Sequence, residues 1–166
     1  MWRMQFSDVS GLDSRDAVAM LDLNNAHVEE TSLLDLKSLN TLLDSAFFAR
    51  GVDRGATAFL IALSHTASYA NPNFMWFSTR RKSFVYVDRI LVSQTARGQG
   101  IAKALYYDLF AAAKRAGFDL VVCEVNIDPP NPASEAFHAA MGFTNVGEAT
   151  IHRGTKTVRY LEKVLA

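Results

Sequence analysis

The sequence predicts an α/β domain with a partly antiparallel central sheet, and three observations support this class. The chain has 166 residues, a length that fits one compact domain and allows about 69% of its surface to be buried. Apolar residues make up 49% of the chain and charged residues 20%, as in an ordinary globular protein. Helix-like and strand-like segments alternate, and the last two strand-like segments have no helix between them. We therefore expect residues 1–166 to form one domain.

The first part of the chain predicts two helices among short strands. Ser14 is a suitable N-cap for a helix over residues 14–23, where apolar residues recur at helical spacing. Leucines at the same spacing predict a second helix over residues 32–45. Strands are expected at residues 2–9, 47–50 and 56–63.

The middle of the chain predicts a loop, a strand and a long helix. An Asn-Pro-Asn sequence interrupts residues 70–81, which we expect to form a loop. Residues 83–92 are rich in β-branched and aromatic side chains, as in a strand. Residues 100–116 carry one apolar stripe at helical spacing, and Gly117 follows where a C-cap glycine is typical.

The last part predicts a buried strand over residues 120–126 and a short helix after it. Asn131, followed by proline, is typical of an N-cap and a first helical turn, and Gly142 ends the helix. A closing antiparallel pair is expected at residues 144–151 and 157–164.

Charge and cysteine content exclude several classes of protein. The chain has 17 basic and 17 acidic residues, so we expect no bulk electrostatic binding to nucleic acid or to an anionic membrane. A single cysteine cannot form an internal disulfide, which favours a reducing compartment.

The longest apolar run, residues 56–63, is far shorter than the ~20 residues of a membrane span, and the first residues lack the apolar stretch of a secretory signal. We expect a soluble, cytoplasmic protein.

The histidines and the cysteine do not predict a metal site. His27, His65 and His152 show no paired ligand spacing, so we expect no metal. Cys123 alternates to the strand face opposite Glu124, and we expect a buried structural cysteine rather than one that carries an acetyl group.

The most informative segment is residues 90–102, where a strand ends and a helix begins after two glycines. Glycines let a ligand approach the backbone closely, and the first helical turn has unpaired N–H groups that attract anions. Arg97 adds a positive charge. The segment is not a P-loop, and Lys103 stands where the dinucleotide-binding pattern needs a third glycine or alanine.

Two blocks of this sequence resemble the GNAT superfamily of N-acetyltransferases. Residues 97–102 read Arg-x-x-Gly-x-Ala, similar to the family's pyrophosphate signature Gln/Arg-x-x-Gly-x-Gly/Ala. Residues 131–143 read Asn-x-x-Ser-x-x-Phe-His-x-x-x-Gly-Phe, similar to the family's Asn-x-x-Ala-x-x-Leu/Phe-Tyr-x-x-x-Gly-Phe. The resemblance covers about residues 84–143. Residues 24–32 more weakly resemble a group of bacterial predicted acetyltransferases of unknown substrate.

The resemblance implies a mostly antiparallel sheet with a splayed parallel strand pair, flanked by about four helices, and acetyl-CoA as co-substrate. The strand of residues 83–92 would splay from that of residues 120–126, with the thioester in the gap. The implied cofactor-binding residues are the pyrophosphate turn Arg97, Gly98, Gln99, Gly100, Ile101 and Ala102, the strand residues Ile90, Leu91 and Val92, and Asn131 and Ser134 on the other side. A backbone N–H near Leu91 or Val92 would stabilise the oxyanion.

The resemblance also implies catalytic roles, with one departure from the family pattern. The family's tyrosine acid is His138 here. A histidine can protonate a thiolate, since its unperturbed pKa is ~6.5; the alternatives are another acid or none. Glu124 is the expected base by its position on the strand, with Asp88 as runner-up, and each carboxylate could instead serve a structural partner.

The implied reaction is direct attack of a primary amine on acetyl-CoA in a ternary complex. Asn25, Glu29 and Glu30 lie in the connection that forms one wall of the family's acceptor site, where carboxylates would favour a cationic amine; a polar first helical turn is the alternative reading. Polyamine, amino acid, antibiotic, peptide N-terminus and protein lysine all stay open as acceptors. So do a non-catalytic acyl-CoA sensor or scaffold, a transferase for a longer acyl chain, and a homodimer.

Overall fold

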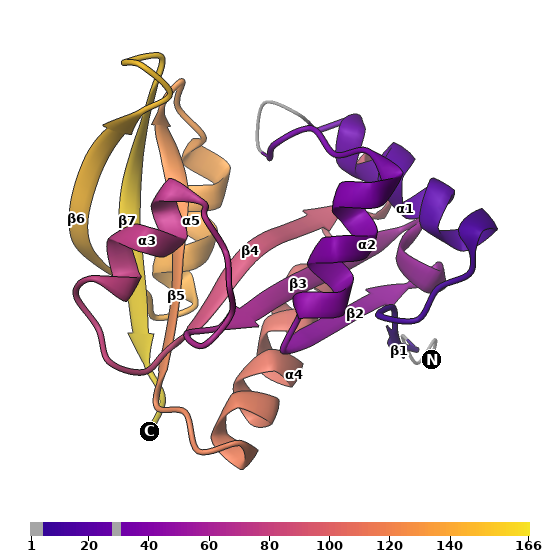
Figure 1. Ribbon diagram of the computed structural model, residues 1–166, viewed down its shortest axis with the longest axis horizontal. Helices are drawn as coiled ribbons and strands as arrows, with labels where there is room; N and C mark the ends of the chain where they lie inside the picture. Colours follow the sequence, from indigo (N-terminus) through magenta and orange to yellow (C-terminus); the bar gives the residue numbers. More distant parts are fainter. Residues whose placement is uncertain (1–4, 28–30) are drawn as a thin grey trace.

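The computed structural model describes residues 5–27 and 31–166, and this part forms one seven-stranded sheet in the order β1-β2-β3-β4-β5-β7-β6 (Figure 1). Neighbouring strands are antiparallel except β4 and β5, which are parallel. The expected mixed, mostly antiparallel sheet is confirmed. The strands are β1 (Ser7–Asp8), β2 (Phe48–Val52), β3 (Ala58–Ser64), β4 (Val85–Val92), β5 (Leu120–Asp128), β6 (Thr144–Ile151) and β7 (Lys156–Val164).

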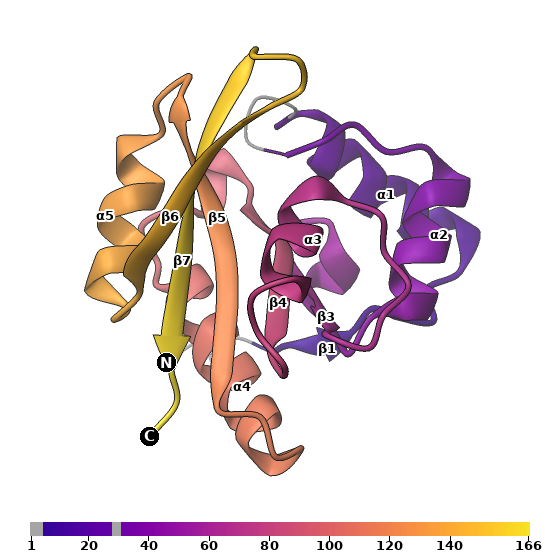
Figure 2. The same cartoon turned by 60° about the vertical axis from the view of Figure 1, so that its left-hand side comes forward.

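Five α-helices cover the two faces of the sheet in the described residues. Side chains of α1, α2 and α3 pack into the core on one face, and those of α4 pack into the core on the other. Figures 1 and 2 show α5 beside β5 and β7. The helices are α1 (Ser14–Asn25), α2 (Leu36–Ser45), α3 (Pro72–Ser78), α4 (Ile101–Arg115) and α5 (Pro132–Ala140). Within the same ranges, no helix has the length and apolar character needed to cross a bilayer.

The prediction of a loop over residues 70–81 is wrong, because α3 lies within it. The Asn71 side chain accepts hydrogen bonds from the N–H groups of Asn73 at 2.8 Å and Phe74 at 3.3 Å. Asn71 is therefore an N-cap, and the proline after it occupies the first turn. The helix has only seven residues, too few for a helical period to be visible, and it buries Phe74 and Phe77.

Two helix starts also differ from expectation. Asp13, not Ser14, caps α1, and its carboxylate accepts from the N–H of Asp16 at 2.9 Å. The second helix starts at Leu36 with Asp35 as its cap, four residues later than predicted. The residues before it are held in another way, since the Asn25 side chain accepts from the N–H of Leu34 at 3.1 Å and donates to its carbonyl at 2.9 Å.

The parallel pair β4–β5 splays after two pairs of residues. Val85 pairs with Val121 and Tyr86 with Val122, and no further β4–β5 pair follows in the described chain. A bulge interrupts the β3–β4 register between the pairs of Val87 and Arg89, so Asp88 has no partner on β3. The two strands diverge beyond that point, as Figure 1 shows. The expected splayed pair is present, and it opens a gap in the middle of the sheet.

Candidate functional site

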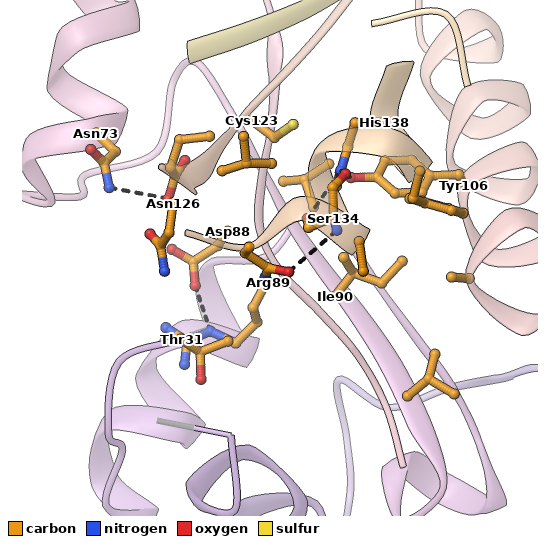
Figure 3. Close-up of a pocket in the computed structure, with 18 of the residues that line it drawn as sticks. Thr31, Asn73, Asp88, Arg89, Ile90, Tyr106, Cys123, Asn126, Ser134 and His138 are labelled. Atoms are coloured by element: carbon orange, nitrogen blue, oxygen red, sulfur yellow. Dashed lines mark hydrogen bonds and ion pairs between the residues drawn. The ribbon is translucent and has the colours of Figure 1, made fainter. Parts of the chain in front are cut away.

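A cavity of about 460 Å³ occupies this gap (Figure 3). Its walls come from β4, β5, the turn before α4, α4 and α5, with Asn71 and Asn73 of the α3 region on one side. Ile151, His152 and Lys156 of the β6–β7 hairpin and Thr31 and Ser32 before α2 also line it. Segments far apart in the sequence therefore meet at one site, as expected for the splayed pair.

The predicted anion turn lies on this wall. Arg97, Gly98, Gly100, Ile101 and Ala102 line the cavity, while Gln99 is not among the lining residues. Gly98 and Gly100 have φ values of +79° and +77°, a conformation that favours glycine. Among the described residues no side chain caps the start of α4, so the N–H groups of its first turn are available to an anion.

The predicted cofactor-binding residues on either side of that turn do not all line the cavity. The side chains of Ile90 and Val92 line the cavity, whereas Leu91 packs into the core on the opposite face. Asn131 and Ser134 line the cavity from α5. The Asn131 side chain accepts from the N–H of Ser134 at 3.3 Å, so Asn131 is also the N-cap of its helix.

Glu124 projects into the cavity from β5 and is held by two side chains. Its carboxylate accepts from the Tyr86 hydroxyl at 2.8 and 3.0 Å and from the Asn73 amide at 3.1 Å. Loss of water around the group raises the pKa of Glu124 to about 8, although the bonds from Tyr86 and Asn73 act in the opposite direction. A carboxyl with that pKa can take up or release a proton near neutral pH.

A second layer of contacts fixes Glu124 from α3 and β7. The Tyr160 hydroxyl donates to the Asn73 carbonyl oxygen at 2.9 Å, which orients the amide so that its nitrogen faces Glu124. The Tyr160 ring stacks on Trp76, with 4.1 Å between ring centroids. Sequence reasoning missed Asn73, because its segment was expected to be a loop; the Asn-Pro-Asn sequence was the signal that could have indicated a capped helix.

Asp88, the runner-up for the base, is committed to an ion pair. Its side chain is 2% exposed, and it accepts from Arg89 Nε at 2.7 Å and from the Tyr69 hydroxyl. Arg89 in turn donates to Asn24 at 2.8 Å and to Ser32. This cluster connects β4 to the segment before α2. The contacts of Asp88 are therefore those of a carboxylate with a structural partner, the alternative to a catalytic base.

His138 reaches the cavity, but both of its ring nitrogens are engaged. Nδ1 lies 2.8 Å from the carbonyl oxygen of Ser134; a carbonyl only accepts, so Nδ1 carries the hydrogen. Nε2 then accepts from the Tyr106 hydroxyl at 2.7 Å. Burial lowers the pKa of His138, partly offset by the bond to Ser134. The ring is therefore neutral near pH 7.

Tyr106 is a residue that sequence reasoning missed. It is fully buried in α4 among aromatic side chains, yet it lines the cavity together with Cys123. Burial raises the pKa of the Cys123 thiol well above its usual value, and the neighbouring Glu124 acts in the same direction. Cys123 is thus a buried thiol that stays protonated, as a structural cysteine does.

The predicted acceptor residues are only partly described. The Asn25 side chain binds the backbone of Leu34 and does not line the cavity. Glu29 and Glu30 lie outside the described residues. Within residues 5–27 and 31–166, no group of three or more His, Cys, Asp or Glu side chains could hold a metal ion.

Comparisons with known proteins agree with this geometry. The model of the acetyltransferase (GNAT) family matches residues 37–143. None of the curated proteins matches the sequence.

Solved structures share the fold along nearly the whole chain. The ribosomal-protein-S18-alanine N-acetyltransferase of Escherichia coli has a TM-score of 0.66 at 15% identity, covering 98% of this chain and 94% of that one. Ard1 from Thermoplasma volcanium has a TM-score of 0.73 at 11% identity, with coverages of 98% and 97%. The protein yncA of Salmonella typhimurium, solved with its cofactor acetyl-CoA, has a TM-score of 0.70 at 16% identity, with coverages of 99% and 95%. Because the family model spans well over half of the sequence, this chain belongs to the GNAT acetyltransferase family.

Proposed function

We propose that this protein is an acetyl-CoA-dependent N-acetyltransferase that moves an acetyl group to a primary amine by direct attack in a ternary complex. One observation carries the proposal. The gap between β4 and β5 opens beside an uncapped, glycine-containing helix start and contains a carboxyl group with a pKa near neutrality. The uncapped helix start and the carboxyl group line one cavity, which supports a cofactor site and a proton acceptor next to each other.

The donor side of the cavity would hold acetyl-CoA through backbone groups. N–H groups of residues 97–102 would bind the pyrophosphate, helped by the positive end of the α4 dipole. Beyond Tyr86 the β5-facing edge of β4 has no strand partner in the described residues, so it can pair with the pantetheine arm like an added strand. A backbone N–H near Leu91 or Val92 would stabilise the oxyanion.

Glu124 would take the proton from the attacking amine, directly or through water. An alkyl ammonium with a pKa of ~10.4 is neutral in roughly one molecule in 2,500 at pH 7, a deficit of about 4.6 kcal/mol. A base with a pKa of about 8 accepts a proton more readily than an ordinary carboxylate does. The departing thiolate would face the side of His138, the predicted acid, which accepts a hydrogen bond from the Tyr106 hydroxyl.

The acceptor is proposed to be a small-molecule or peptide amine. The Escherichia coli neighbour acts, by its name, on the alanine of a ribosomal protein, which supports peptide N-termini as one class. The single cysteine supports a cytoplasmic location, and a homodimer is compatible with the family. A sensor without turnover and a transferase for longer acyl chains are the alternatives that the assay must separate.

The test is release of CoA thiol from acetyl-CoA in the presence of amine pools, with the acetylated product identified by its mass. We expect thiol release that depends on the amine and that falls at least about 100-fold in Glu124→Gln. Slow release at the same rate with and without amines, despite tight acetyl-CoA binding, would indicate a sensor instead. A faster reaction with a longer acyl-CoA would replace acetyl as the natural group.

A further inference from the structure

The hydroxyl of Tyr106 is held at the cavity wall by a chain of hydrogen bonds. Tyr106 Oη lies 2.7 Å from His138 Nε2, and His138 Nδ1 is anchored to the Ser134 carbonyl at 2.8 Å. All three residues line the cavity, and Figure 3 shows the tyrosine hydroxyl beside the imidazole. We propose that Tyr106, oriented by His138, donates the hydrogen bond that stabilises the departing thiolate of CoA. This inference rests on the proposed function and deepens it.

His138 cannot offer its own N–H groups to the sulfur in the observed arrangement. Its one ring hydrogen, on Nδ1, points to the carbonyl of its own helix, and Nε2 is occupied by the phenol. The ring is 4% exposed and neutral, because burial lowers its pKa. The hydroxyl of Tyr106 carries a hydrogen that can turn toward the cavity, and Tyr106 lines the cavity beside His138.

The phenol lies at the apex of the gap, where a thioester would sit. Tyr86 and Val122 form the last pair of β4 with β5, and Cys123 is the next residue along β5. The Cys123 thiol lies beside the Tyr106 hydroxyl, and each affects the other through a hydrogen bond. Glu124 faces the other side of the sheet, toward Asn73. A thioester at the apex would therefore have Tyr106 on its leaving-group side and Glu124 on the amine side.

The phenol stays protonated over the working pH range. Burial raises the pKa of Tyr106 well above its usual value of 10. The titratable groups around it are His138, Cys123 and Glu124; the last two act in the same direction as burial. A phenol that never ionises is always available as a donor, and donation to a charged acceptor is stronger than donation to a neutral one.

The step balances without an added acid. The C–S bond breaks and its electron pair stays on sulfur. The Tyr106 hydrogen turns from His138 Nε2 to the thiolate. His138 keeps its hydrogen on Nδ1, bonded to the Ser134 carbonyl at 2.8 Å, and Tyr106 keeps its proton, because it donates only a hydrogen bond. The thiolate takes a proton from water as CoA leaves, and Glu124 returns to water the proton lost by the amine.

The test measures the pKa of the CoA thiol while CoA is bound, from the ultraviolet absorbance of the thiolate. It needs no acceptor. The wild type is compared with Tyr106→Phe and with Tyr107→Phe, a control at the neighbouring residue, which is 56% exposed. Loss of a hydrogen bond to a charged group should raise the bound-thiol pKa by about 1–2 units in Tyr106→Phe. Tyr107→Phe should match the wild type, and CoA affinity at low pH should change less than about twofold in both.

A second variant tests whether a hydroxyl placed on α5 restores the lowered pKa of the bound CoA thiol. The double variant Tyr106→Phe/His138→Tyr removes the phenol from α4 and places one on α5, where the family pattern has its tyrosine. It should restore a lowered thiol pKa, whereas His138→Phe, which keeps the Tyr106 hydroxyl but frees it, should lose part of the effect. Once an amine acceptor has been identified, Tyr106→Phe should lower kcat about 10- to 100-fold and leave the KM for acetyl-CoA nearly unchanged.

Equal bound-thiol pKa values in the wild type and Tyr106→Phe would overturn the inference while leaving the proposed function intact. Failure of the wild type to bind CoA at all would overturn the proposed function itself. If Tyr106→Phe does not fold, the wild type alone decides: a bound-thiol pKa at or above that of free CoA contradicts the role of Tyr106.

Discussion

Cys123 and Glu124 are neighbours on β5 and point to opposite faces of the sheet. Cys123 packs in the core that contains the α4 side chains, and Glu124 accepts a hydrogen bond from Asn73 of α3. Both line the cavity, because β4 separates from β5 immediately before them. In the proposed reaction, one strand would thus present a leaving-group side and an amine side to a single thioester.

Replacement of Glu124 should remove the base. Glu124→Gln keeps the size and the hydrogen bonds to Tyr86 and Asn73 but cannot accept the amine proton. A positioned base contributes typically 10²–10⁴-fold, so kcat should fall at least about 100-fold. The control is Glu148→Gln, whose carboxylate pairs with Arg159 on the outer hairpin. An unchanged kcat in Glu124→Gln, or an equal loss in the control, would exclude Glu124 as the base.

The pH dependence of activity should contain an ionisation near 8. Because burial raises the pKa of Glu124 to about 8, the wild-type rate should rise as pH increases through that value. Rates must be expressed per neutral amine, since the amine ionises as well. The step near pH 8 should be absent from the residual activity of Glu124→Gln; its persistence there would assign it to another group.

Stability should also depend on the ionisation of Glu124. Its pKa is raised from 4.5 in the reference state to about 8 in the folded protein, so between these values the folded state binds a proton that the unfolded state has released. The contribution of Glu124 to the free energy of unfolding therefore falls as pH rises from about 4.5 to 8.

Glu124→Gln has no such titration, so it should gain stability relative to the wild type between pH 5 and pH 9. Urea unfolding of both proteins at the two pH values measures the difference. Comparison of the pair cancels the opposite contribution of His138, whose pKa is lowered. A difference that does not change with pH would mean that Glu124 has an ordinary pKa.

The glycine at the start of α4 should matter for the cofactor beyond its effect on folding. Gly100 and Gly117 have φ values of +77° and +88°, and an added Cβ would meet no atom within 4 Å at either position. Gly100→Ala and Gly117→Ala should therefore lose similar stability, about 1–2 kcal/mol each. Of these two glycines, only Gly100 lines the cavity, so only the Gly100 variant should bind acetyl-CoA more weakly. Equal affinity of the two variants would contradict the assignment of the turn.

Asn73 should act as a positioning residue for Glu124. The hydrogen bond from the Asn73 side-chain amide to the carboxylate lowers the pKa of Glu124. Asn73→Ala should therefore move the ionisation near 8 to higher pH and lower the rate at pH 7. Tyr160→Phe frees the amide without removing it and should give a smaller shift in the same direction. If the pH–rate profiles of these variants do not shift from that of the wild type, Asn73 has only a structural role.

Local patterns in the sequence predict most of the sheet and the anion turn. Strand alternation places Cys123 and Glu124 on opposite faces, and the spacing of the glycines around Gln99 indicates the phosphate-type turn. Both are properties of a few consecutive residues, so no tertiary information is needed. The parallel pair and its splay are expected from the family resemblance alone.

The other features of the site could not be predicted from the sequence, because they depend on tertiary contacts. Tyr106 and His138 are 32 positions apart, and their pairing appears only when α4 and α5 pack on the same side of β5. The short helix α3 shows no period, so Asn73 could not be assigned to Glu124 from the sequence. The commitment of Asp88 to Arg89 depends on the bulge in β4, which breaks the strand alternation.

The most direct test of the central claim is thermal unfolding of the wild-type protein with and without acetyl-CoA, compared with ATP and NAD. A ligand at 100 times its Kd stabilises the folded state by about 2.7 kcal/mol, or roughly 5–10 °C in Tm for a chain of this size. We expect a shift of that order with acetyl-CoA and none with the other two. No shift with acetyl-CoA would contradict the assignment of the turn before α4, and the proposed enzyme activity with it.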